Sequence, residues 1–235
     1  MSNKGESKQT KSRSMPKQIH VSKKETYWII HTKSGPHSKS TSMPLGLIVR
    51  NFAKIATTLR EAKSVLNHGE IKVNGVIRKD HQFPVGLFDV VSVEKQKLFF
   101  RVLLDDKERL ILKTIEKESK EKVSKVTKKI MTSKGIQLTT NDGRTYFGIK
   151  ADVEDSLKIK LPEGKVEETI KFEEGAVAYV TKGAHASETA TVKGIVSGTA
   201  RRKELVKLAN KDEEFETIAE NVFVIGKGKS AMAEM

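Results

Sequence analysis

The stretch "IKVNGVIRKD", residues 71–80, decides how the first folded part of this chain is read. Asn74-Gly75 stands between two short apolar runs, and this dipeptide is the strongest local signal for a two-residue β-hairpin. The reason is that a type I′ turn needs positive φ at both central residues. The same ten residues carry three cations and one acid, Asp80. The hairpin therefore predicts either an ordinary solvated sheet face or a surface on which a polyanion lies.

Two helices are expected before the hairpin. Pro44 suits the first turn of a helix, and the apolar residues after it recur at helical spacing and predict one buried stripe: Leu45, Ile48, Phe52 and Ile55. Two cations share the opposite side, Arg50 and Lys54. A second helix begins after Thr57 or Thr58, either of which is a good N-cap, and ends at Gly69. Its polar stripe consists of Arg60, Lys63 and Asn67.

The second helix runs directly into the hairpin through Gly69. If its polar stripe and the hairpin face the same way, five cations converge on one area: Arg60, Lys63, Lys72, Arg78 and Lys79. Side chains of this kind hold RNA through phosphates and riboses and read little sequence. The alternative is a generic αβ domain with a charged face.

The composition favours a nucleic-acid partner. The chain has 235 residues, enough for two or three small domains, with a formal net charge of +14. A protein this basic attracts nucleic acid or an anionic membrane at long range. Cysteine is absent and the six histidines show no paired ligand spacing, so no metal site is expected. No apolar run approaches the roughly 18 residues of a membrane span, and no signal peptide is recognised, so a cytoplasmic protein is expected.

The positive charge is concentrated near the N-terminus. Residues 1–42 hold nine Lys and Arg against two Glu, whereas residues 171–235 hold ten of each sign. The first 26 residues are expected to be disordered in the free protein. We favour the interpretation that this arm becomes ordered when it binds phosphate groups over the interpretation that it is only a solubilising tail. Residues 27–30, "YWII", are expected to dock on a globular part. The candidate RNA contacts in this region are Lys11, Arg13, Lys17, Lys33 and Lys39.

The rest of the chain reads as short strands. "DVVSVEK" and "LFFRVLL" follow the hairpin, and residues 106–170 predict an antiparallel β unit with a second hairpin at Asp142-Gly143. The charged segment 116–126 is expected to be a solvated helix or loop that passes into a strand. Residues 171–235 predict five strands of a small SH3-like barrel. The basic run 201–207 either touches RNA or balances nearby acids, and "GKGKS", residues 226–230, lacks the spacing of a phosphate loop.

Three resemblances follow from these motifs. The helix–helix–hairpin–strand order resembles the alpha-L RNA-binding motif of ribosomal proteins, pseudouridine synthases and tyrosyl-tRNA synthetases. Residues 178–192 resemble the KOW motif, with Gly183 at a KOW glycine but Ser187 and Ala190 where small glycines are usual. Five further stretches are informative: "SGPH", "PLGLIVRN", "FPVGLFDVVSVEK", "VTKGA" and "NVFVIGKG". Through them the chain resembles, over nearly its full length, the S-four-e family of archaeal and eukaryotic-type small-subunit ribosomal proteins.

The family resemblance implies a structural constituent of the small ribosomal subunit that binds its ribosomal RNA beside neighbouring ribosomal proteins, without catalysis, cofactor or small-molecule substrate. It implies RNA contacts at Arg50 and Asn51, and an extended segment laid on RNA at Gly35, Pro36 and His37. The expected fold class is α+β, mainly β. The expected parts are a basic arm and extended segment at 1–42, an alpha-L domain at 43–105, a central β domain at 106–170 and a KOW domain at 171–235.

Two other functions remain open at this stage. An RNA-modification enzyme with an alpha-L unit needs a catalytic Asp in a large separate domain, for which the short strands after residue 105 leave no room. A KOW elongation factor needs an N-terminal partner domain that this chain lacks, and it does not explain the basic arm.

Overall fold

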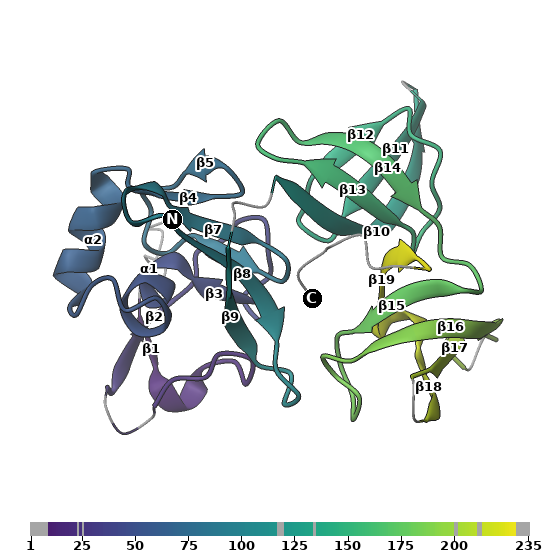
Figure 1. The fold of residues 1–235 in the computed structure, drawn as a ribbon, viewed down its shortest axis with the longest axis horizontal. Coiled ribbons are helices and arrows are strands. Elements are labelled where there is room, and N and C mark those ends of the chain that lie inside the picture. Colours follow the sequence, from purple (N-terminus) through teal and green to yellow (C-terminus); the bar gives the residue numbers. More distant parts are fainter. Residues whose placement is uncertain are drawn as a thin grey trace, which may run out of the picture. The chain divides into compact units, whose positions relative to one another are not determined.

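The chain forms two compact units, one of residues 1–103 with 109–118 and one of residues 104–108 with 119–235 (Figure 1). The computed structural model describes residues 9–22, 24, 26–116, 120–133, 135–199, 202–210 and 213–228. Parts of four sequence predictions lie outside these residues, namely parts of the basic arm, of the charged segment 116–126, of the basic run 201–207 and of "GKGKS".

A five-stranded sheet in the order β5-β4-β7-β8-β9 forms the centre of the first unit. Its strands are β4 (Ile71–Val73), β5 (Val76–Ile77), β7 (Val90–Val93), β8 (Leu98–Leu104) and β9 (Leu110–Ile115), and η3 (Glu94–Gln96) joins β7 to β8. Asn74 and Gly75 have φ of 52° and 76°, so the predicted β4–β5 turn has positive φ at both central residues. All four residues of β7 are buried, as a strand in the middle of a covered sheet requires.

The first predicted helix is wrong in its geometry. One turn of α-helix, α1 (Leu45–Leu47), is followed by a π-helical segment, η2 (Ile48–Phe52), in which the Ala53 amide donates to the Ile48 carbonyl at 2.8 Å. Lys54 then takes a left-handed φ of 52° and ends the helix. Ile55 therefore lies beyond the helix rather than on its buried stripe.

The second helix, α2 (Leu59–Asn67), has the predicted bounds. Thr58 caps its first turn, and Gly69 has φ of 75°, as the predicted C′ position requires. The helix buries Ala62 and Leu66. Helix α2 lies in contact with α1, whose three residues are also buried.

The described residues of the basic arm form secondary structure. β1 (Gln9–Lys11) pairs antiparallel with β2 (Trp28–Ile30), η1 (Ser12–Ser14) follows β1, and Ile19 is buried and bridges to Leu110. The expectation of a disordered arm is therefore wrong for these residues. They order because they can pair with backbone groups of the rest of the unit.

Residues 27–30 divide into two pairs. Ile29 and Ile30 are buried, as expected for a docked segment, whereas Tyr27 and Trp28 are exposed, contrary to that expectation. Further along the chain, β3 (Ser42–Pro44) pairs with β6 (Pro84–Gly86) and leads directly into α1.

The second unit begins with an all-antiparallel sheet in the order β12-β11-β10-β13-β14. Its strands are β10 (Glu121–Thr132), β11 (Gly135–Thr140), β12 (Thr145–Phe147), β13 (Ser156–Lys160) and β14 (Lys165–Ile170). Val126, Leu138 and Leu157 form the centre of its core. The solvated reading of the segment before residue 126 is wrong for β10, because Lys122 and Lys125 are buried.

The C-terminal part of the second unit is a five-stranded antiparallel sheet in the order β18-β17-β16-β15-β19. Its strands are β15 (Ala176–Val180), β16 (Thr189–Val196), β17 (Leu205–Ala209), β18 (Glu214–Ile218) and β19 (Val222–Lys227), and η4 (Ala219–Asn221) lies between the last two. The chain as a whole is thus mainly β with few helices.

Neither a membrane span nor a metal cluster is found in the described ranges. No helix there is long and apolar enough to cross a membrane. Within the same ranges, no group of three or more His, Asp and Glu side chains is placed to hold a metal ion.

Candidate nucleic-acid interface

Helix α2 is fixed at its start by a reciprocal capping box. The Glu61 amide donates to the Thr58 hydroxyl at 3.2 Å, and the Thr58 amide donates to the Glu61 carboxylate at 3.3 Å. The backbone amide and the hydroxyl of Thr57 also donate to this carboxylate, and these bonds hold the pKa of Glu61 below its ordinary value. The helix therefore begins at a defined residue, which fixes the direction in which its polar stripe points.

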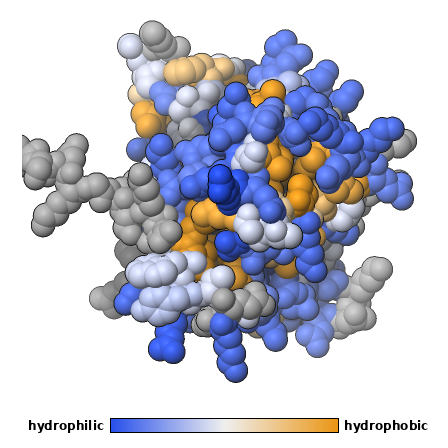
Figure 2. Space-filling model, turned by 90° about the vertical axis from the view of Figure 1, so that its left-hand side faces the viewer, coloured by the Kyte–Doolittle hydropathy of each residue, from blue (hydrophilic) through white to orange (hydrophobic). Residues whose placement is uncertain are grey.

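That polar stripe faces solvent. Arg60, Lys63 and Asn67 are all exposed. In the described part of the chain, neither Arg60 nor Lys63 has an ion-pair partner. Hydrophilic residues cover most of the face of the first unit on which α2 lies, with an apolar strip between them (Figure 2).

The three hairpin cations differ in their surroundings. Lys72 is partly buried and its ammonium pairs with Glu94. Arg78 is also partly buried, and its guanidinium lies 4.6 Å from the centre of the Phe83 ring. Lys79 is exposed and, among the described residues, has no ion-pair partner. Two of the three hairpin cations are thus held by the fold, and Lys79 is the one that is open to a ligand.

The end of α2 and the second hairpin strand lie against each other. A Cβ atom added at Gly69 would lie 3.4 Å from Cγ2 of Ile77, and the Arg78 amide donates to the Ile71 carbonyl at 3.3 Å. The structure therefore brings the chain at Ile77–Lys79 to the C-terminal end of the helix that carries Arg60 and Lys63.

The cations predicted on the first helix are divided by its π-helical geometry. Arg50 is partly buried and its Nε donates to Oδ1 of the adjacent Asn51 at 2.8 Å. Its Nη2 atom is buried without a hydrogen-bond partner in the described structure. Lys54 is exposed, but it follows the helix and does not share a helical face with Arg50.

The segment "GPH" packs against the unit itself rather than lying open. A Cβ at Gly35 would approach Cγ of Pro84 to 2.6 Å, and a Cβ at Gly86 would approach the His37 ring to 2.5 Å. Both glycines are therefore required for this close contact. Gly35 is exposed and Pro36 partly exposed, whereas His37 is buried. The expectation that His37 lies on RNA is wrong for its side chain, because β6 and Asp89 enclose the ring.

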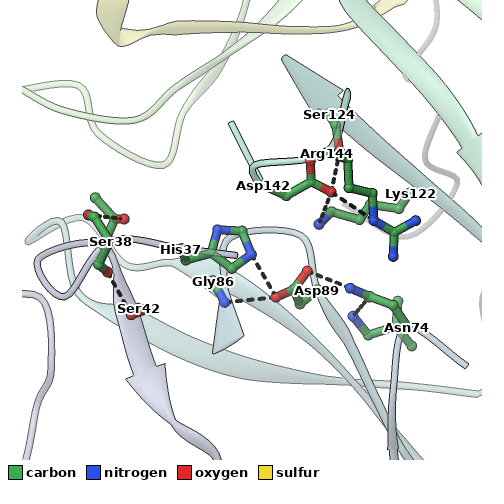
Figure 3. A network of polar contacts seen from close by, with 12 residues as sticks. His37, Ser38, Ser42, Asn74, Gly86, Asp89, Lys122, Ser124, Asp142 and Arg144 are labelled. Atoms are coloured by element: carbon green, nitrogen blue, oxygen red, sulfur yellow. Dashed lines mark hydrogen bonds and ion pairs between the residues drawn. The ribbon is translucent and has the colours of Figure 1, made fainter. Parts of the chain in front are cut away.

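Asp89 joins this segment to the hairpin (Figure 3). Its Oδ2 atom lies 2.9 Å from His37 Nε2 and accepts from the Gly86 amide at 2.8 Å, while its Oδ1 atom accepts from Asn74 Nδ2 at 2.8 Å. Asn74 Oδ1 accepts in turn from the Val90 amide at 2.9 Å. Sequence reasoning missed this network. The sequence feature that could have indicated this network is a single acid, Asp89, inside the apolar run "FPVGLFDVV".

The cations of the N-terminal segment remain at the surface. Lys11, Arg13 and Lys17 are exposed. Lys33 and Lys39 are exposed as well, and Lys33 Nζ lies 3.7 Å from Asp80. All five candidates are therefore accessible, in contrast to His37.

The second unit uses its most buried cations internally. Lys122 Nζ lies 3.2 Å from Asp142 Oδ2, and Ser124 and Arg144 approach the same carboxylate (Figure 3). Burial by itself raises the pKa of Asp142. The charge of Lys122 and a hydrogen bond from the Thr140 hydroxyl outweigh burial, so the pKa is lowered. This cluster is a support for the β10–β11 sheet and not a surface site.

The loop around Gly183 is tied to residues 104–108. The Gly183 amide donates to the Glu108 carboxylate at 2.7 Å, and the Ser187 hydroxyl donates to Asp106 at 2.8 Å. Tyr179 also lies against Leu104, whose amide donates to the phenol oxygen at 3.2 Å. Burial raises the pKa of Tyr179 to about 12. Two of the protein's own carboxylates thus bind this loop, Glu108 at the Gly183 amide and Asp106 at the Ser187 hydroxyl.

The basic run near residue 203 is balanced by acids. Lys203 lies 2.8 Å from Glu220, and Lys207 lies 3.7 Å from Glu216 on the neighbouring strand. Of the two readings left open by the sequence, these contacts favour charge balance over RNA contact.

Comparison with known proteins identifies the class of the first unit. Residues 48–91 match the S4 domain, and this range contains η2, α2, the β4–β5 hairpin and Asp89. Residues 96–166 match the model described as ribosomal family S4e.

The curated relatives extend this match to the whole chain. The chain is 38% identical to small ribosomal subunit protein eS4 of Archaeoglobus fulgidus, over 92% of both chains. It is also 38% identical to the protein of the same name from Methanosphaera stadtmanae, over 99% of this chain and 98% of the relative. The crystal structure of the 30S ribosomal protein S4e from Thermoplasma acidophilum superposes with a TM-score of 0.67 at 33% identity, covering 80% of this chain and 96% of that one. The chain belongs to the ribosomal S4e family.

Proposed function

We propose that this chain is a structural constituent of the small ribosomal subunit, that it binds small-subunit ribosomal RNA and that it takes part in translation without catalysing a reaction. Its relatives are named small ribosomal subunit proteins and match it over nearly the full length. The proposal places the protein on cytoplasmic ribosomes, beside other small-subunit proteins. The net charge of +14 supports a polyanionic partner.

The proposed architecture follows the order of the elements. The helix–helix–hairpin segment within residues 43–105 is proposed as an alpha-L unit, preceded by the basic segment 1–42 and followed by the central β domain 106–170. The five strands within residues 171–235 are proposed as an SH3-like KOW barrel. The close ties between residues 104–108 and the Gly183 loop support a structural role for that loop.

The observation that carries the RNA-binding proposal is the set of open cations on α2 and the hairpin. Arg60, Lys63 and Lys79 are exposed, and within the described residues they have no ion-pair partner. Cations without an internal partner on a matched S4 domain are free to neutralise phosphates, and contacts of this kind fix the register of RNA on a protein. Three partly buried cations, Arg50, Lys72 and Arg78, are proposed to support the edge of this surface. Asn51, Lys54 and Asn67 are proposed to do so with them.

The test is the double variant Arg60→Ala/Lys79→Ala in the full chain. We expect weaker binding to a small-subunit ribosomal RNA fragment and release from small subunits at lower salt in co-sedimentation, with an unchanged melting temperature because both side chains are exposed. The matched control is Lys171→Ala/Lys193→Ala, which removes two exposed charges from the second unit. Equal weakening by both pairs would contradict the proposed surface, and a large fall in melting temperature would show that Arg60 and Lys79 are structural.

A further inference from the structure

Two large aromatic side chains at the start of β2, in the β1–β2 strand pair, are exposed to solvent. Tyr27 is 60% exposed and Trp28 is 51% exposed, while the next two residues, Ile29 and Ile30, are 2% and 4% exposed. The strand β2 is therefore anchored by its isoleucines, and the packing of the unit does not require the two rings. Exposed apolar groups that lie together mark a site for a partner.

The two rings are held in a defined arrangement. Trp28 stands opposite Lys11 in the β1–β2 pair, and the Ser12 amide donates to the Tyr27 carbonyl at 2.9 Å. The rings of Tyr27 and Trp28 lie 5.1 Å apart at 84°. An edge-to-face pair of this kind uses only one of the four ring faces. Flat faces remain available to a planar ligand.

The charge around the rings defines the chemistry of that ligand. Lys11 Nζ lies 5.6 Å from the centre of the Tyr27 ring, and Arg13 and Lys17 are exposed on the same short segment. Between residues 9 and 33 the sequence holds six cations and one acid. A ligand that fits both features is planar and apolar on its faces and strongly anionic along its length. An unpaired nucleic-acid strand has these properties, because its bases expose their faces and its phosphates carry the charge.

We propose that Tyr27 and Trp28 form a stacking site for unpaired bases of the bound RNA, with Lys11 and Arg13 holding the phosphates of the same strand. This inference rests on the proposed RNA-binding function and adds a subsite for single-stranded RNA to the phosphate surface of α2. Stacking on an aromatic ring tolerates any base, so the site selects unpaired over paired RNA rather than a sequence.

The chain contains one tryptophan, so the intrinsic tryptophan fluorescence of the full-length protein reports on Trp28 alone. We expect saturable quenching by an unpaired oligoribonucleotide of mixed sequence. We expect little quenching by the same strand annealed to its complement, by heparin, or by vesicles containing phosphatidylserine. Equal quenching by the duplex or heparin would overturn the proposal in favour of charge alone, and quenching by the vesicles would overturn it in favour of a lipid surface.

Variants separate stacking from folding and from general RNA binding. Trp28→Ala should weaken binding of the unpaired strand about tenfold, and Trp28→Phe should restore most of that loss because a phenyl ring still stacks. Phe147→Ala, which removes a ring that is 54% exposed in the second unit, is the matched control and should change affinity less than twofold. Unchanged affinity in Trp28→Ala, or no recovery in Trp28→Phe, would overturn the stacking site.

The stacking site and the proposed function fail in different ways. If the wild-type chain binds RNA, and Arg60→Ala/Lys79→Ala weakens that binding while Trp28 is neither quenched nor required, only the stacking site is refuted. If the wild-type chain binds no RNA at low salt, both are refuted.

Discussion

At the scale of single residues, Asp89 decides how three separate stretches of the sequence meet. It is 1% exposed, and it joins "SGPH" through His37, the hairpin turn through Asn74 and its own loop through the Gly86 amide. A buried carboxylate is tolerated only when hydrogen-bond donors surround it, as they do here. The preceding residue, Phe88, is fully buried with φ of 64°, an unusual conformation for an aromatic residue. The hydrogen bonds of its carboxylate and the buried side chain of Phe88 thus both hold Asp89 in position.

We expect Asp89→Asn to lower the free energy of unfolding by about 2–4 kcal/mol, because an amide turns a donor toward groups that themselves donate. Urea unfolding followed by circular dichroism measures this. Asp80→Asn is the control: Asp80 is half exposed, and an amide oxygen still accepts from the Gln82 amide, so its effect should stay within about 0.5 kcal/mol. Similar losses in the two variants would show that the Asp89 network contributes little.

Asp142 makes the second unit sensitive to acid. The pKa of Asp142 in the folded protein lies below its ordinary value of 3.8, so the unfolded chain binds more protons between the folded pKa and 3.8. The stabilisation from the Lys122 pair is therefore complete above that range and is lost as the pH falls through the folded pKa. We expect Asp142→Asn to be less stable than wild type at neutral pH, with a difference that shrinks in acid. Urea midpoints measured across this range test this, and a difference that does not change with pH would contradict it.

At the scale of elements, one lysine joins the two sheets of the second unit. Lys125 on β10 donates to the carbonyls of Ala219, Glu220 and Val222 at 3.0, 3.2 and 2.7 Å, and its ammonium also pairs with Glu154. These carbonyls belong to η4 and the start of β19. Burial lowers the pKa of Lys125, and the hydrogen bond to Glu154 partly offsets this. The Lys125 ammonium thus supplies hydrogen-bond donors to backbone carbonyls of η4 and of the first residue of β19.

Removal of this ammonium should loosen β19 more than the rest of the sheet. We expect Lys125→Met to lower the free energy of unfolding by about 3 kcal/mol, since it leaves buried carbonyls and a carboxylate without their donor. Amide hydrogen exchange in β19 should rise. Lys128→Met, on the exposed part of the same strand, should have an effect within about 0.5 kcal/mol. Unchanged exchange in β19 would show that Lys125 does not join the two sheets.

Local signals predicted elements well where the local chemistry is decisive. Asn74-Gly75 fixed the hairpin, and Thr58 with Gly69 fixed the bounds of α2, because turns and caps depend on adjacent residues. The π-helical segment after Leu47 was not predictable in this way, since a one-residue widening leaves an apolar stripe that still reads as α-helix. The buried Lys122 and Lys125 were missed for a related reason. Their partners Asp142 and Glu154 lie far along the chain, and a lysine in a polar run reads as exposed.

At the scale of the whole molecule, the net positive charge is concentrated toward the N-terminal end of the chain. Half of the net charge of +14 lies in residues 1–42, and residues 171–235 are neutral overall. Ion pairs such as Lys203–Glu220 and Lys207–Glu216 use the cations of the C-terminal sheet. Arg60, Lys63 and Lys79 of the first unit have no such ion-pair partners among the described residues. RNA affinity should therefore come mainly from the first unit.

This division predicts how affinity depends on salt. If about six phosphates are neutralised, a plot of log affinity against log salt should have a slope of about −4 to −5. Arg60→Ala/Lys79→Ala should reduce the magnitude of that slope by about 1.5, because two fewer counterions are released. Trp28→Ala should lower affinity at every salt concentration while leaving the slope unchanged, because stacking releases no counterions. A wild-type slope near zero would refute electrostatic binding, and a change of slope in Trp28→Ala would show that the aromatic site acts by placing the cations rather than by stacking.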